Sequence, residues 1–86
     1  EALADGAVAC GLPRDKAMVC AAQMLVGTGK LYLENRKHPG AMKDAVCSPG
    51  GTTIQGVRTL EKNGFRSAAM EAVIAAYDKT MEMQKK

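Results

Sequence analysis

The chain has 86 residues, of which 47% are hydrophobic, and its net charge is +3. A chain this short forms one domain and buries only about 60% of its unfolded surface, so its own core is small. The basic residues are scattered and 3% of the residues are aromatic, which argues against a nucleic-acid-binding surface. No apolar run approaches the roughly 20 residues of a membrane-spanning helix, so we expect no membrane partner.

The three cysteines, Cys10, Cys20 and Cys47, are odd in number and lack C-x-x-C spacing. This argues against a disulfide framework and against a zinc site. We predict buried free thiols in a reducing compartment, and therefore a cytoplasmic protein with a mitochondrial location as the alternative. The single histidine, His38, has no ligand residues spaced around it, so we interpret it as a turn residue and predict no metal site.

The first two predicted helices follow from apolar residues at helical spacing. Residues 1–10 form the first helix, and Gly11 is a plausible residue to follow its end. Pro13 stands in the first turn of a second helix over 13–36, where its missing N–H costs nothing. Because the chain opens in helical phase without Met, we expect it to be a piece of a longer protein.

The second helix keeps two glycines, Gly27 and Gly29, that cost roughly 1 kcal/mol each against Ala. Its apolar residues cover a wide arc, which is typical of a helix that is central or packed against a partner. Two explanations of the glycines stay open. Either they kink the helix, or another backbone crosses it closely at that point.

Three further helices complete the predicted fold. His38-Pro39-Gly40 ends the long helix, and residues 41–47 make two further turns. The helix that contains Ile54, Val57 and Leu60 ends at Asn63-Gly64, and the last helix runs from Phe65 to the C-terminus. The last helix has apolar residues at the clearest helical spacing: Met70, Val73, Ile74, Tyr77 and Met81. We predict an all-α bundle of four to five helices, in which the methionines fill the core instead of lining an adaptable peptide groove.

The stretch Ser48-Pro49-Gly50-Gly51-Thr52-Thr53 interrupts the helical pattern. Glycine permits turns and the close approach of a ligand to the main chain, and Thr52 or Thr53 is a natural N-cap for the helix that follows. A helix N-terminus attracts a carboxylate or a phosphate, to which hydroxyl groups would add hydrogen bonds. The alternative is an ordinary helix connection with a cap.

The chain resembles the C-terminal dimerisation domain of the pyrroline-5-carboxylate reductase family over nearly its whole length. The matching residues are Glu1-Ala2-Leu3-Ala4-Asp5-Gly6, Gly11-Leu12-Pro13, His38-Pro39-Gly40, Lys43-Asp44 with Val46, Ser48-Pro49-Gly50-Gly51-Thr52-Thr53-Ile54, and Leu60-Glu61 with Gly64-Phe65-Arg66. The resemblance implies that residues 1–86 form a homodimer with interlocked subunits, and that dimers assemble into larger rings.

The resemblance also implies an oxidoreductase that reduces 1-pyrroline-5-carboxylate to L-proline with NADPH or NADH. Carried over by position, the residues that would bind this small-molecule substrate are Ser48, Gly50, Gly51, Thr52 and Thr53. Backbone amides near Gly51 and Thr52 would hold its carboxylate. The hydroxyl of Thr53 would meet the ring nitrogen, which makes Thr53 the candidate catalytic residue.

The resemblance also implies that an N-terminal Rossmann domain holds the nicotinamide cofactor, and the 86 residues themselves contain no G-x-G-x-x-G sequence. Ala45 stands where many family members have an Asn that reaches the cofactor, so we assign no cofactor-binding residue here. The fragment alone should therefore be inactive. The alternative function is a non-catalytic helical dimerisation or assembly module, and a nucleic-acid-binding bundle is a weaker third.

Overall fold

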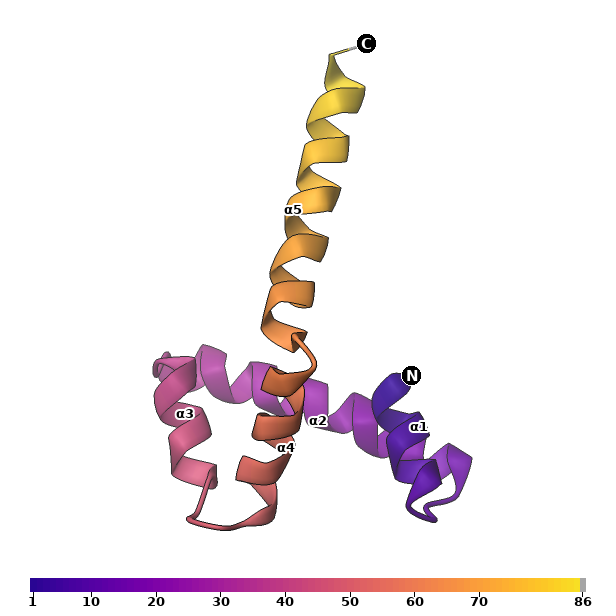
Figure 1. Ribbon diagram of the computed structural model, residues 1–86, viewed down its shortest axis with the longest axis vertical. Helices are drawn as coiled ribbons and strands as arrows, with labels where there is room; N and C mark the ends of the chain where they lie inside the picture. Colours follow the sequence, from indigo (N-terminus) through magenta and orange to yellow (C-terminus); the bar gives the residue numbers. More distant parts are fainter. Residues whose placement is uncertain (86) are drawn as a thin grey trace. The chain divides into compact units, whose positions relative to one another are not determined.

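The computed structural model describes residues 1–85 and contains five α-helices joined by short turns, with no strand in that range (Figure 1). The helices are α1 (Ala2–Ala9), α2 (Arg14–Asn35), α3 (Pro39–Val46), α4 (Thr52–Lys62) and α5 (Phe65–Gln84). The predicted all-α fold of four to five helices is confirmed. The chain divides into two compact units, Glu1–Met42 and Lys43–Lys86.

In the first unit, α1 ends in a Schellman motif at Gly11. The Gly11 N–H donates to Val8 O at 2.9 Å, and the Leu12 N–H donates to Ala7 O at 3.0 Å. This reversal needs a left-handed residue, and Gly11 has φ +106°. The predicted helix end is therefore confirmed, and the turn brings α2 back along α1.

The buried residues of the first unit are small and lie on α1 and α2, which contact each other. Ala4 and Ala17 are the two residues within 1–85 that are fully buried. An ion pair between Arg14 and Asp5 also joins the two helices, but both side chains are more than half exposed. Exposed pairs contribute little to stability, so burial of the alanines matters more than this ion pair.

The end of α2 differs from the prediction. The helix stops at Asn35, because Arg36 takes a left-handed conformation with φ 54° and its N–H donates to Tyr32 O. His38-Pro39-Gly40 does not end α2 but begins α3, where Pro39 is the first helical residue. A proline is favoured there because its missing N–H would have no helical partner.

In the second unit, α4 and α5 meet at the predicted stop. Asn63 follows the end of α4, and Gly64 is left-handed with φ 73°. The Gly64 N–H donates to Glu61 O at 3.1 Å, and Gly64 O accepts from the Ala68 N–H at 2.9 Å. One glycine thus ends α4 and begins α5, which confirms the boundary expected at Asn63-Gly64.

Both long helices carry exposed apolar residues. Every residue of Phe65–Gln84 is exposed, including the central Ile74 at 48% and Val73 at 71%. On α2, Val19 is 69% and Leu25 62% exposed. Each helix therefore has an apolar face that its own unit leaves uncovered.

Two predictions about burial are wrong for the same reason. Met18, Met70 and Met81 were expected to fill the core, yet they are 45%, 56% and 39% exposed. The thiols were expected to be buried, yet Cys10 and Cys20 are exposed and Cys47 is half-buried. Helical spacing identifies which residues share an apolar face, but it does not say that the same chain covers that face.

The structure leaves the two explanations of the α2 glycines open. The helix is continuous through Gly27 and Gly29. Within residues 1–85, no atom outside the helix's own backbone lies within 4 Å of where a Cβ would stand at either glycine.

Among residues 1–85, no helix is both long enough and apolar enough to cross a membrane.

Candidate functional site: the turn before α4

The candidate site is a tight turn that leads from α3 into α4. The Gly51 N–H donates to Ser48 O at 3.0 Å and closes a four-residue turn over Pro49 and Gly50. Gly50 has φ +70°, which a residue with a Cβ rarely adopts. A proline at the second position of the turn and a left-handed glycine at the third are typical of a type II turn.

Gly51 is confined by Ser48. A Cβ on Gly51 would stand 2.7 Å from Ser48 Oγ and 3.2 Å from Ser48 O. The first neighbour is a side-chain oxygen that can rotate, but the second belongs to the backbone of the turn. A side chain at residue 51 would therefore require Ser48 Oγ to rotate and the backbone of the turn to shift by a few tenths of an ångström.

The N-cap of α4 corrects the sequence prediction. Gly51, with φ −81° and ψ 178°, is the N-cap, and it makes no side-chain capping hydrogen bond. Thr52 and Thr53, which were predicted as alternative caps, are instead the first two helical residues. The turn places the extended backbone of Gly51 at the helix boundary, so the threonines fall inside the helix.

This arrangement leaves several donors free at the start of α4. The N–H groups of Thr52, Thr53 and Ile54 lie in the first turn, where no intrahelical carbonyl can accept them. The Gly51 N–H, which we expected to help hold a carboxylate, donates to Ser48 O instead. The amides suited to an anion are therefore those of residues 52–54, where the helix dipole also favours negative charge.

The hydroxyl groups of the site are open to a ligand. Ser48, Thr52 and Thr53 are exposed, and the side-chain hydrogen bonds within residues 1–85 use neither threonine hydroxyl of this pair. By contrast, the Thr59 hydroxyl donates to Gln55 O at 2.9 Å within α4. The turn thus gathers all five predicted residues, Ser48, Gly50, Gly51, Thr52 and Thr53, but their roles stay predictions.

The charged groups that precede the turn are paired with each other. Lys43 Nζ lies 3.0 Å from Asp44 Oδ1. The hydrogen bond and the charge of Asp44 raise the pKa of Lys43. Lys43 therefore stays cationic but already has a carboxylate partner. An anion at α4 would depend on backbone amides and hydroxyls more than on this lysine.

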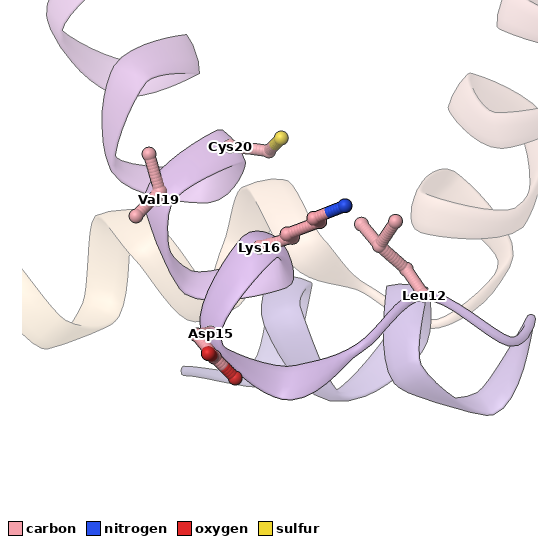
Figure 2. A pocket seen from close by; sticks show the side chains of 5 residues that line it. All are labelled: Leu12, Asp15, Lys16, Val19 and Cys20. Carbon is pink, nitrogen blue, oxygen red and sulfur yellow. The ribbon is translucent and has the colours of Figure 1, made fainter.

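A separate hollow lies in the first unit. Leu12, Asp15, Lys16, Val19 and Cys20 line it, and Figure 2 shows Leu12 and Lys16 extending toward one another while Asp15 points away. None of the predicted site residues lies there. Within residues 1–85, the His, Cys, Asp and Glu side chains form no group of three that could hold a metal ion.

A known protein family matches almost the whole chain. Residues 1–83 match the family described as pyrroline-5-carboxylate reductase dimerisation. The chain belongs to this family. The match covers all five helices except the last residue of α5, so the family resemblance seen in the sequence is confirmed.

Several relatives of this family are similar along the whole chain. The pyrroline-5-carboxylate reductase of Synechocystis is 57% identical over 86 residues, and that of Escherichia coli K12 is 52% identical over 85. These alignments cover 100% and 99% of this chain, respectively, and 32% of each relative. The chain thus spans about a third of the length of the curated relatives it matches.

Solved structures are also similar. A 1-pyrroline-5-carboxylate reductase from Streptococcus pyogenes matches with a TM-score of 0.86 and 35% identity, over 92% of this chain and 30% of that chain. A pyrroline carboxylate reductase from Plasmodium falciparum, solved with NADP bound, matches with a TM-score of 0.84 and 35% identity, over 91% and 30%. The helical fold described above is therefore one that solved reductases contain.

Proposed function

We propose that this chain is the dimerisation and substrate-binding part of an oxidoreductase that reduces 1-pyrroline-5-carboxylate to L-proline, the last step of proline biosynthesis. The observation that carries the proposal is the free helix N-terminus behind the Ser48–Gly51 turn, in a chain 52–57% identical to pyrroline-5-carboxylate reductases. A small carboxylic acid is the kind of ligand that such a helix start binds.

In this proposal the substrate carboxylate lies on the first turn of α4. The amides of Thr52 and Thr53 donate to it, and Ser48 adds its hydroxyl. Gly50 and Gly51 let the ligand approach the main chain because they carry no side chain. The positive end of the helix supports the negative charge without requiring a cationic side chain.

Thr53 is the residue that we assign to the reaction. Its hydroxyl meets the ring nitrogen of the substrate and orients the C=N bond. The nitrogen must finish protonated, but a threonine hydroxyl is a poor acid, so the proton comes from water while Thr53 positions the ring. The contribution of the site is therefore mainly correct placement of the substrate.

The cofactor in this proposal is NADPH or NADH, which supplies the hydride. Residues 1–86 contain no glycine-rich dinucleotide fingerprint, so they do not fit the role of nucleotide site. We assign that role to an N-terminal Rossmann domain outside this chain. The NADP-bound relative from Plasmodium falciparum supports a nicotinamide cofactor for the whole enzyme.

We further propose that the partner is a second copy of the chain, with dimers joining into larger rings. The open apolar faces of α2 and α5 support this, since each large apolar side chain contributes about 1.5–3 kcal/mol when it is buried. The three free thiols suit a reducing compartment. We propose the cytoplasm, with the mitochondrion as the alternative.

The test is a pair of threonine substitutions in the full-length protein. Thr53→Ala is expected to lower kcat/KM for 1-pyrroline-5-carboxylate by about 10–100-fold, because the ring loses its positioning hydroxyl. Thr59→Ala is the matched control: it removes an α4 hydroxyl that is bonded to Gln55 O, and it should change kcat/KM less than twofold. Steady-state kinetics with NADPH measures both.

Two results would contradict the proposal. An unchanged rate in Thr53→Ala would remove Thr53 from the reaction while leaving the family assignment intact. A full-length wild-type protein that dimerises but shows no reductase activity with either nucleotide would favour the non-catalytic assembly module instead.

A further inference from the structure

We draw no further inference here: the strongest candidate, the hollow in the first unit that Leu12, Asp15, Lys16, Val19 and Cys20 line, carries none because nothing in the part of the chain that the structure describes shows what covers it.

Discussion

The turn before α4 and the open faces of α2 and α5 are built in opposite ways. The turn is complete within one chain. The Gly51 N–H closes onto Ser48 O, Gly50 takes a positive φ that residues with a Cβ rarely adopt, and Gly51 leaves the space that Ser48 occupies. The long helices are regular, yet the apolar side chains on α5 stay 39–71% exposed. The turn is finished locally, while the long helices leave apolar side chains exposed.

The difference shows what a dimerisation domain depends on. Burying the five apolar residues at helical spacing on α5 would contribute on the order of 10 kcal/mol, at about 1.5–3 kcal/mol each. That equals the whole stability of a typical small domain. We therefore expect assembly to stabilise this fold, whereas the turn before α4 keeps its geometry through contacts within a few residues.

The largest effect should come from a charge on the open face of α5. Ile74→Asp is expected to raise the Kd of the dimer by more than about 100-fold, because the interface would have to bury an unpaired carboxylate. Glu71→Gln, on another side of the same helix, is the control and should leave assembly unchanged. Sedimentation velocity measures both. A dimer that tolerates Ile74→Asp would show that this face is not the interface.

The turn should be almost as sensitive to a single methyl group. Gly51→Ala places a Cβ against Ser48, so kcat/KM of the full-length enzyme is expected to fall about 10–100-fold while the dimer persists. Gly56→Ala adds the same methyl group within α4, where nothing lies within 4 Å, and should stabilise the helix by about 1 kcal/mol. Equal activity of the two variants would refute the steric argument.

The smallest expected effect concerns a glycine of α2, and it decides between the two explanations left open. If another backbone crosses α2 closely in the dimer, Gly29→Ala should weaken assembly by about tenfold, although this chain has open space there. We expect this weakening, because Gly29 lies on the apolar face with Leu25. A more stable helix with unchanged dimer affinity would show that no backbone crosses. Thermal unfolding and sedimentation together distinguish the two outcomes.

Sequence reasoning located most helix ends because their signals are local. Gly11 and Asn63-Gly64 were predicted as stops, and both glycines take left-handed conformations that end a helix. The N-cap of α4 was missed, because threonine is a common cap and nothing in the residue types indicates that the turn closes at Gly51. His38 was interpreted as a turn residue because no ligand residues are spaced around it, and the hydrogen bond that its ring accepts from the Gly40 N–H was not foreseen.

The sequence by itself determined the family, an all-α fold of four to five helices and the glycine-rich turn, because these depend on residue type and on contacts a few residues apart. Only the tertiary structure decided that Gly51 is the cap, that Thr52 and Thr53 lie inside α4, and that the methionines and cysteines expected in a core lie largely exposed. Burial depends on which surfaces meet in space. Apolar periodicity marks a face, but it cannot say which molecule will cover it.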